Sequence, residues 1–543
     1  MQAKRVIRAG AALFAAAVLS ACGGGGGGGG SAPAPAPSQP PLPQTYVPTG
    51  RTAAGDTFVH LFEWRWADIA RECEQWLGPR GFKAVQISPP SEHAVVNGNP
   101  WWQRYQPVSY RLDRSRSGTL AEFTDMVSRC RAVGVDIYAD AVINHMTAGS
   151  GVGSAGSSYT KYSYPAVPWA PEDFHAACSI NSYNNAFQVQ NCELVGLSDL
   201  KTEETRVRNR IADYLIDLHR LGVAGFRIDA AKHMHPRDID AIVARVNEAA
   251  LAATPARTRP YFFLEVINNP GEAVTAQEYF GVGNASGGAS DVTDFLYGYR
   301  VTDAFTGRSN ATLQSLQNLT GGLLPSDKSV VFVDNHDNQR GDNLRYADAT
   351  YERATMFLLA HPQGYPALMS SYGFDRSSLA GRDAGPPSDG NGATQSVFDG
   401  NGNSRCTAAL GSAQVGQWVC EHRVPAIAQM VAFRKAAAGA PLSNCGRAGG
   451  SWAISGDANR IALCRDGAGF LALSRSAVGG TDVMPTLLPA GSYCNVAVHS
   501  YTPAGNGAAA ACSGAPVVVG PGGVASITLP PQGAVALHVG ARL

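Results

Sequence analysis

The stretch Val223-Ala224-Gly225-Phe226-Arg227-Ile228-Asp229 holds the pattern that decides the fold, a short apolar run that ends in charged residues. Similar apolar runs lie at 58–62, 84–87, 135–138, 261–267, 330–333 and 367–371. Helical patterns at 120–133, 204–221 and 238–253 lie between several of them. Strands that alternate with helices indicate a parallel sheet with crossover connections.

Several of these runs end in polar clusters, at 140–145, 227–229, 264–265 and 334–337. A (β/α)8 barrel carries its chemistry at the carboxyl ends of its strands. Asp229, Glu265 and Asp337 follow one another at intervals of 36 and 72 residues, which fit one and two strand-helix units of about 36. We therefore predict an α/β fold built on a (β/α)8 TIM barrel at 51–438.

Two further units are expected. The interval from His145 to Asp229 is 84 residues, and its part at about 146–196 is rich in Gly, Ser, Tyr and Asn without helical periodicity. We expect this segment to be an inserted domain after the third strand. Beyond Ala438, short strands alternate with Gly, Pro and Asn turns, so 439–543 is predicted to form a C-terminal antiparallel β-sandwich domain.

The N-terminus has the pattern of an export signal. Lys4, Arg5 and Arg8 precede an apolar run at 11–18 that is too short to span a bilayer. The run ends in Leu-Ser-Ala-Cys, which looks like a lipobox, so we predict a lipoprotein signal peptide at 1–22 with lipidation of Cys22. The alternative is an ordinary signal peptide followed by a stray cysteine. The Gly-rich and Pro-rich segment 23–50 is typical of a tether.

Eleven cysteines leave an even ten once Cys22 is set aside, in a compartment that permits disulfides. No CxxC cluster is present, which argues against a zinc site. Pairing between sequence neighbours is plausible, although the sequence leaves the connectivity open. Those pairs are Cys73 with Cys130, Cys178 with Cys192, Cys406 with Cys420, Cys445 with Cys464, and Cys494 with Cys512.

Composition narrows the choice of partner. The chain has 43 Lys+Arg against 43 Asp+Glu, so it offers no net field to a nucleic-acid backbone or to anionic lipid headgroups. We expect no nucleic-acid partner. No further apolar span follows the signal, so we expect membrane contact only through a lipid anchor.

The three carboxylates at strand ends suggest glycoside cleavage. Cleavage with retention needs one carboxylate as nucleophile and one carboxylic acid to protonate the leaving oxygen, about 5 to 5.5 Å apart. Asp229, Glu265 and Asp337 could supply these groups from the rim of one barrel. The alternative for any one of them is a helix cap or an ion pair with a nearby arginine.

The local motifs resemble glycoside hydrolase family 13, and within it the animal-like α-amylases that also occur in bacteria. The resemblance runs from His60-Leu61-Phe62-Glu63-Trp64 to the terminal β domain. Four segments carry it in the family's order, 140–145, 225–233, 263–266 and 332–339. It implies the barrel, the inserted domain and the C-terminal β domain that the spacing predicts.

The resemblance implies a role for each carboxylate. Asp229 matches the nucleophile, Glu265 matches the acid that later acts as the base, and Asp337 matches a residue that binds sugar hydroxyls in the transition state. Glu265 must be protonated near neutrality, and burial beside other carboxylates would raise its pKa. We expect Arg227 to keep Asp229 ionised.

Other positions match the family's sugar-binding residues. Segment 100–107 supplies flat apolar rings on which glucose can stack. Two histidines match donors to the sugar at the cleavage point, and Lys232 and His233 match residues on the reducing side. The implied substrate-binding set is Trp101, Trp102, Tyr105, Gln106, His145, Arg227, Lys232, His233 and His336.

The resemblance also implies ions. A structural calcium would take side-chain oxygens from Asn144 and Asp199 and backbone carbonyls from Gln190 and His233. Arg227 and Asn335 match two of three chloride ligands. The third position falls near Ala349 or Thr350, neither of which is basic, so chloride dependence is left open.

The resemblance implies an exported, monomeric α-amylase that cleaves internal α-1,4 bonds of starch, glycogen or maltooligosaccharides. We expect an outer-membrane or cell-surface lipoprotein, or otherwise a secreted enzyme. An exo-acting or transglycosylating relative would use the same carboxylates. A noncatalytic glucan-binding lipoprotein is the alternative from another functional class.

Overall fold

The computed structural model describes residues 39–50, 52–253, 258–407, 409–505 and 508–543. The predicted signal peptide, Cys22 and most of the predicted tether lie outside these residues. Among the described helices, none is both long enough and apolar enough to cross a membrane.

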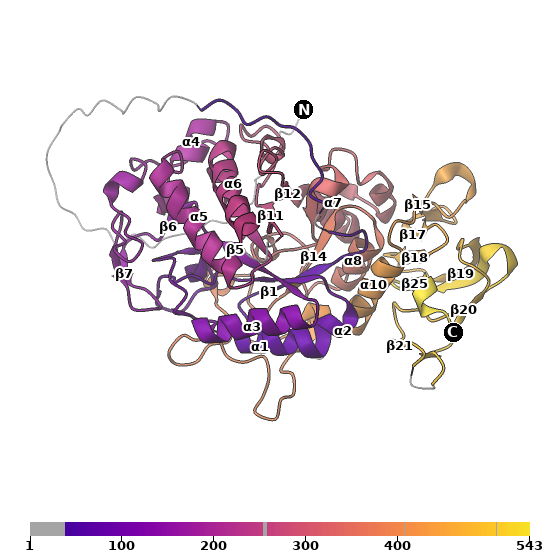
Figure 1. Ribbon diagram of the computed structural model, residues 1–543. Coiled ribbons are helices and arrows are strands. Elements are labelled where there is room, and N and C mark those ends of the chain that lie inside the picture. The colour runs from indigo at the N-terminus through magenta and orange to yellow at the C-terminus, as the bar shows by residue number, and fades with distance from the viewer. Residues whose placement is uncertain (1–38, 51, 254–257, 408, 506–507) are drawn as a thin grey trace.

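Eight parallel strands close into a barrel in the order β1-β14-β13-β12-β11-β10-β5-β2 (Figure 1). Almost every strand residue is buried, as expected for parallel strands covered on both faces. The strands are β1 (Phe58–Leu61), β2 (Ala84–Ile87), β5 (Asp136–Ala141), β10 (Gly225–Ile228), β11 (Tyr261–Leu264), β12 (Ser290–Thr293), β13 (Ser329–Val331) and β14 (Tyr365–Ser370). The predicted (β/α)8 barrel is confirmed.

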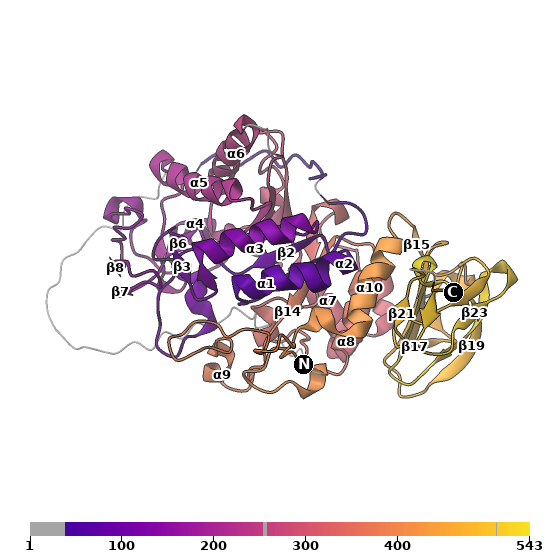
Figure 2. The same ribbon diagram turned by 60° about the horizontal axis from the view of Figure 1, so that its bottom comes forward.

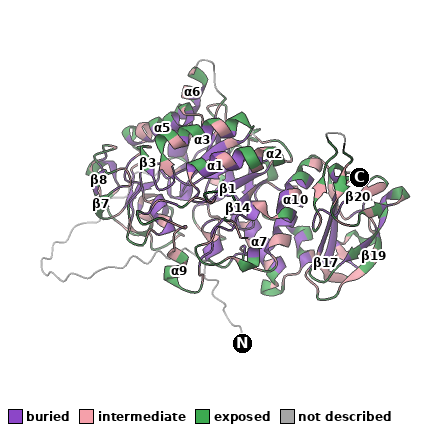
Figure 3. Ribbon diagram, turned by 90° about the horizontal axis from the view of Figure 1, so that it is seen from below, coloured by how far each residue is buried: buried purple, intermediate pink, exposed green. Residues whose placement is uncertain are grey.

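Helices surround the barrel, as Figure 2 shows from a second direction. In α5, Ile211, Leu215 and Leu218 recur every three or four residues and are buried, so one face of the helix packs inward. Figure 3 shows the same division, with buried strands inside and exposed helix faces outside. The helices are α1 (Trp66–Glu72), α2 (Gly78–Arg80), α3 (Leu120–Ala132), α4 (Ala186–Asn191), α5 (Thr205–Arg220), α6 (Pro236–Ala252), α7 (Phe295–Thr306), α8 (Tyr351–Ala360), α9 (Leu379–Asp383) and α10 (Pro425–Ala436).

The segment between β5 and α5 leaves the barrel after its third strand. It contains α4 and two small antiparallel ribbons, in which β6 pairs with β9 and β7 pairs with β8. A further ribbon, β3 with β4, precedes α3. These strands are β3 (Arg114–Ser115), β4 (Gly118–Thr119), β6 (His145–Met146), β7 (Ser150–Val152), β8 (Ser158–Thr160) and β9 (Ser198–Asp199).

The C-terminal region consists of antiparallel sheets. One has the order β15-β17-β18-β25 with β16 beside β17, a second has the order β19-β24-β23-β20, and β21 pairs with β22. Phe470 and Leu537 of the first sheet share a buried core with Ile527 and Leu529 of the second, as in a β-sandwich. The strands are β15 (Leu442–Ser443), β16 (Ala453–Ile454), β17 (Asp457–Arg465), β18 (Gly469–Ser474), β19 (Gly480–Pro485), β20 (Gly491–Tyr493), β21 (Tyr501–Thr502), β22 (Ala511–Cys512), β23 (Val517–Val519), β24 (Val524–Leu529) and β25 (Ala534–His538).

Ten cysteines form five disulfides, each between neighbours in the sequence. The pairs are Cys73–Cys130, Cys178–Cys192, Cys406–Cys420, Cys445–Cys464 and Cys494–Cys512. The second of them lies in the segment that leaves the barrel.

The described end of the predicted tether packs against the barrel. Nε2 of Gln39 donates to the Asp238 carboxylate at 3.2 Å, and the Leu42 side chain is buried. Nδ2 of Asn284 donates to the carbonyl of Thr45 at 2.7 Å. These residues therefore belong to the folded unit. Composition did not reveal this, because the partners Asp238 and Asn284 lie far away in the sequence.

Candidate active site

Strand register places the carboxylates together. Parallel pairing aligns Ile228 with Leu264, so the next residues, Asp229 and Glu265, leave their strands side by side. The same register aligns Arg227 of β10 with Asp140 of β5. The barrel therefore delivers these groups to one end, as the polar strand ends predict.

Arg227 contacts three of the carboxylates. Its Nη1 donates to Oδ1 of Asp140 at 2.6 Å and to Oδ1 of Asp229 at 2.9 Å, while its Nη2 pairs with Oε1 of Glu265. The backbone N–H of Ala230 donates to Oε2 of Glu265 at 2.9 Å. Asp140, Asp229 and Glu265 are all buried. The guanidinium thus fixes the spacing of the predicted nucleophile and the predicted acid.

Burial raises the pKa of the carboxyl groups in this cluster. The pKa of Asp140 is about 7, since burial outweighs Arg227, and the pKa of Asp337 is about 8, since burial is reinforced by Glu265. Burial also raises the pKa of Asp229 and of Glu265, against the opposing charge of Arg227. A raised pKa suits Glu265 as an acid. For Asp229, Arg227 acts in the expected direction but burial outweighs it.

Asp337 lies beside the stacked rings of His336 and Tyr105, which we name the aromatic wall. Its Oδ2 is 3.3 Å from Nε2 of His336, and the His336 ring stacks on Tyr105 with centroids 4.9 Å apart. Burial and the charge of Arg227 lower the pKa of His336 well below its ordinary value, so its imidazole is neutral near pH 7. The hydroxyl of Tyr105 donates to Oδ2 of Asp140 at 3.0 Å, which ties the wall to the carboxylates.

Trp101 and His145 support this wall from behind. Trp101 is 3% exposed, and its ring meets Tyr105 and His336 edge-on. Nε2 of His145 donates to the carbonyl of Tyr105 at 3.0 Å, and its Nδ1 accepts from Nδ2 of Asn144. Trp101 and His145 therefore hold Tyr105 in place, the first through its ring and the second through a hydrogen bond. Trp102 is more exposed than Trp101.

Of the remaining predicted cleft residues, Gln106 and His233 contact the segment that leaves the barrel. Oε1 of Gln106 accepts a hydrogen bond from the Thr147 hydroxyl at 2.7 Å. Nδ1 of His233 donates to the carbonyl of Val189 at 2.8 Å. Lys232 is buried and pairs with Glu272, so it is not the solvated charge that an isolated lysine would suggest.

The predicted calcium ligands come from segments that contact one another. Pairing of β6 with β9 aligns His145 with Asp199, which brings Asn144 and Asp199 close. The bond from His233 to Val189 brings the backbone at 233 next to the residue before Gln190. All four groups would present oxygen, which fits a hard cation. In the described ranges, no group of three or more His, Cys, Asp or Glu side chains could hold a metal. The predicted calcium ligands are of another kind, since they include one Asn side chain and two backbone carbonyls.

The Asp199 carboxylate has a second partner that the sequence did not single out. Nδ1 of His175 donates to its Oδ2 at 2.7 Å, and Nε2 of His175 faces Glu203 at 3.0 Å. Burial raises the pKa of Asp199 to about 7. His175 thus holds one oxygen of Asp199 in place from inside the inserted segment.

The two predicted chloride residues have protein partners. The charged groups that Arg227 contacts are the three carboxylates already described. Oδ1 of Asn335 accepts from the backbone N–H groups of Asp337 and Asn338, at 3.0 and 2.8 Å. Asn335 therefore shapes the turn that presents Asp337.

Arg340 contacts the residues around the site, and no sequence motif indicated it. Its Nη1 donates to the carbonyl of His336 at 2.8 Å, and its Nε donates to the carbonyl of Arg382 at 2.9 Å. Its guanidinium also lies 4.7 Å from the centroid of Trp101. It joins the aromatic wall to the long loop after β14.

Comparison with known proteins gives a consistent result. Residues 77–293 match the family model described as "Alpha amylase, catalytic domain". The α-amylase of Pecten maximus is 41% identical over 507 residues, which cover 90% of this chain and 93% of that protein. The pancreatic α-amylase of Sus scrofa is 42% identical, with 90% and 93% covered.

Solved structures agree. The crystal structure of α-amylase I from Eisenia fetida superimposes with a TM-score of 0.78 at 38% identity, covering 91% of this chain and 99% of that chain. A variant of the same enzyme, described as a complex with maltohexaose, superimposes with a TM-score of 0.79.

Proposed function

The chain belongs to the α-amylase family of glycoside hydrolases, and from that membership we propose that it hydrolyses internal α-1,4-glucosidic bonds of starch and glycogen with retention of configuration. The observation that carries this proposal is the placement of Asp229 and Glu265 side by side on Arg227. The maltohexaose complex of the Eisenia fetida relative supports a linear maltooligosaccharide as ligand.

In the proposed mechanism, an oxygen of Asp229 attacks the anomeric carbon while the Glu265 carboxylic acid protonates the departing glycosidic oxygen. The products are a β-glucosyl ester on Asp229 and a free sugar hydroxyl. Water then attacks the same carbon, Glu265 takes its proton, and the ester bond breaks. Asp337, with neutral His336, binds ring hydroxyls more tightly as the sugar flattens toward an oxocarbenium ion.

We propose that the substrate cleft is lined or supported by the aromatic wall and by the residues around Lys232. Tyr105, Trp102 and His336 offer rings, and Gln106 and Lys232 offer polar groups. Trp101, His145 and Arg227 act through neighbours that they hold, and His233 contacts the segment that forms one side of the cleft.

Substitution of the acid tests the catalytic proposal against the glucan-binding alternative. We expect Glu265→Gln to lower hydrolysis by about 100- to 10,000-fold while maltohexaose affinity is kept, because only proton transfer is lost. Glu278→Gln serves as a control, since Glu278 caps a short helix through the N–H of Thr275. If the unaltered protein shows no starch hydrolysis, the catalytic proposal fails.

Product analysis on amylose tests internal cleavage. Cuts inside the chain destroy iodine-binding length before many reducing ends appear. We expect rapid loss of iodine colour with little early reducing sugar. Release of one short product from the start would instead identify an exo-acting enzyme, and longer products than the substrate would identify transglycosylation.

We also propose that Asn144 and Asp199 side chains, with the carbonyls of Gln190 and His233, hold a structural Ca²⁺. When bound, the ion would link the barrel to the inserted segment through oxygen ligands from both. Support comes from the β6–β9 pairing, which brings Asn144 close to Asp199, and from the bond of His233 to Val189, the residue before Gln190.

Finally, we propose export and lipid anchoring at Cys22, with secretion of an unanchored monomer as the alternative. The signal-like residues 1–22 and five disulfides support an oxidising compartment. Mass spectrometry of the mature N-terminus tests the anchor. A diacylated Cys22 is expected, whereas an unmodified Cys22 or a start well beyond it would refute lipidation.

A further inference from the structure

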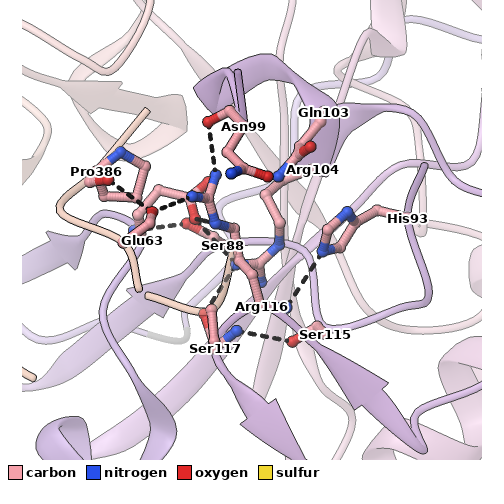
Figure 4. Close-up of polar contacts among 12 residues, drawn as sticks. Glu63, Ser88, His93, Asn99, Gln103, Arg104, Ser115, Arg116, Ser117 and Pro386 are labelled. Carbon is pink, nitrogen blue, oxygen red and sulfur yellow. Dashed lines mark hydrogen bonds and ion pairs between the residues drawn. The ribbon is translucent and has the colours of Figure 1, made fainter. Parts of the chain in front are cut away.

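Figure 4 shows a second buried ion cluster, which joins the turn after β1 to the segment that carries Tyr105. It consists of Glu63, Arg104 and Arg116, and we name it the Glu63 cluster. We propose that these three are positioning residues, which hold the segment 100–106 in the place where its rings meet the sugar. The inference rests on the proposed function. It gives a role to Glu63 in segment 60–64 and to Arg104 in segment 100–107, which the proposed mechanism does not use.

Glu63 turns out of the end of β1 into the protein interior. Its φ of 65° lies in the left-handed region, which is costly for a residue with a side chain. Its N–H donates to Oγ of Ser88 at 2.9 Å, which fixes the turn against β2. The preceding residue, Phe62, stacks on His336 with centroids 5.2 Å apart. The strained turn therefore sends two successive side chains to the aromatic wall and to the cluster.

Arg104 connects this turn to the 3-10 helix Trp101–Tyr105. Its side chain is fully buried, and its Nη1 donates to Oε2 of Glu63 at 3.0 Å and to Oγ of Ser117 at 2.8 Å. Its Nη2 donates to the carbonyl of Pro89 at 2.6 Å. Three partners thus hold the guanidinium in one orientation. Arg104 is the residue that precedes Tyr105.

Arg116 holds the other end of the segment. Its Nη1 donates to the carbonyl of Asn99 at 3.2 Å, and its Nη2 donates to Oγ of Ser388 at 2.6 Å, in the long loop after β14. Its Nε faces Oε2 of Glu63 at 3.7 Å. Arg104 and Arg116 therefore grip the segment on both sides of Trp101, and both depend on one carboxylate.

The arrangement of Arg104 and Arg116 depends on the negative charge of Glu63. One anion faces two guanidinium groups, and the nearby His93 is neutral, because burial and the charge of Arg104 lower its pKa well below the ordinary value. Loss of the Glu63 charge would leave two buried cations without a counter-ion, which strongly favours rearrangement. The chain that must rearrange is the one that carries Tyr105.

Movement there would reach the sugar site through contacts already described. Tyr105 stacks on His336 and donates to Asp140, and Trp101 braces both rings. Asp229 and Glu265 keep their own support from Arg227. Disturbance of the Glu63 cluster should therefore weaken sugar binding more than it slows the chemical step.

The test compares Glu63→Gln and Arg104→Lys with Glu72→Gln. Glu72 is also fully buried and accepts bonds from His422 and Arg423, both at 2.8 Å, but it contacts no part of the aromatic wall. We expect the first two variants to raise KM for maltohexaose about fivefold or more, with a smaller change in kcat. Glu72→Gln should lower Tm with KM unchanged. An unchanged KM in folded Glu63→Gln, or an equal rise in Glu72→Gln, would overturn the proposal.

Two additions keep the result decisive. Affinity for maltohexaose is measured by calorimetry with Glu265→Gln present in every variant, so the cluster is tested even if the unaltered protein fails to hydrolyse starch. If Glu63→Gln does not fold, Ser388→Ala removes the outer contact of Arg116 and the hydrogen bond from the Ser388 hydroxyl to the carbonyl of Pro386, and it leaves the contacts of Glu63 in place. We expect it to weaken affinity about twofold without a change in Tm, and unchanged affinity would count against the proposal.

Discussion

Nη1 of Arg227 lies 2.9 Å from Oδ1 of Asp229, the carboxylate that follows it by two residues on the same strand end. The two side chains point the same way because residues i and i+2 of a strand share a face. The guanidinium also pairs with Glu265 on the next strand. A single side chain thus contacts both the proposed nucleophile and the proposed acid, and its charge lowers the pKa of each against the larger effect of burial.

Replacement of Arg227 should therefore shift the pH profile as well as the rate. The charge of Arg227 lowers the pKa of both Asp229 and Glu265. We expect Arg227→Gln to lower kcat by about 100-fold or more and to move both limbs of the kcat/KM profile to higher pH. Arg227→Lys keeps the charge and loses the fork, so it should lower kcat with a smaller pH shift. A profile unmoved in Arg227→Gln would contradict the proposed coupling.

Asp337 should limit stability at neutral and alkaline pH. Its pKa in the folded protein is about 8 against 3.8 as the ordinary value, so the folded state holds the proton more tightly than the unfolded chain. Stability is therefore lost as pH rises from 3.8 to about 8. Asn cannot ionise, so Asp337→Asn should raise Tm by about 2 °C at pH 8 and have little effect near pH 4, while kcat falls. Asp217→Asn serves as the control, because Asp217 is an exposed residue of α5. Equal Tm differences at both pH values would contradict the assignment.

The apolar runs predicted seven barrel strands, and the eighth shows the limit of that signal. Strand β12 reads Ser-Asp-Val-Thr, so no apolar run marks it. Its Asp291 is buried because the Tyr261 hydroxyl donates to it at 2.7 Å, and its Ser290 hydroxyl donates to the carbonyl of Val282. A buried polar strand depends on partners from elsewhere in the chain, and local composition cannot reveal them.

The same limit applies to the site. Asp229, Glu265 and Asp337 could be predicted because strand ends of a barrel converge, whatever the loops do. Glu272 and Arg340 could not, because their partners, Lys232 and the carbonyl of Arg382, meet them only through tertiary contacts. The sequence therefore identified the groups proposed for chemistry and Arg227, which contacts two of them, but it missed Glu272 and Arg340.

Loss of the Cys73–Cys130 disulfide should cost more stability than loss of the Cys406–Cys420 disulfide, which closes a shorter loop. This pair is separated by 57 residues and joins the end of α1 to α3, whereas Cys406 and Cys420 are separated by 14. In the chain-entropy model, these closures contribute about 4 and 3 kcal/mol. We expect the Cys73→Ser/Cys130→Ser double variant to have the lower urea midpoint of the two double variants. The reverse order would show that native-state packing, not loop length, dominates.

Calcium should stabilise the fold through Asp199. Binding to the folded state alone adds about 2.7 kcal/mol when free calcium is 100 times Kd, so EDTA should lower Tm and added Ca²⁺ should restore it. We expect Asp199→Asn to remove most of this calcium-dependent rise in Tm, since a neutral amide is a weaker ligand. Asp173→Asn is the matched control. Asp173 is as buried as Asp199 and lies in the same inserted segment, but it pairs with Arg206 and caps the N–H of Ala170 at 2.9 Å. The Asp173→Asn variant should have a Tm that is lowered by the same amount with and without calcium. A full calcium response in Asp199→Asn would place the ion elsewhere.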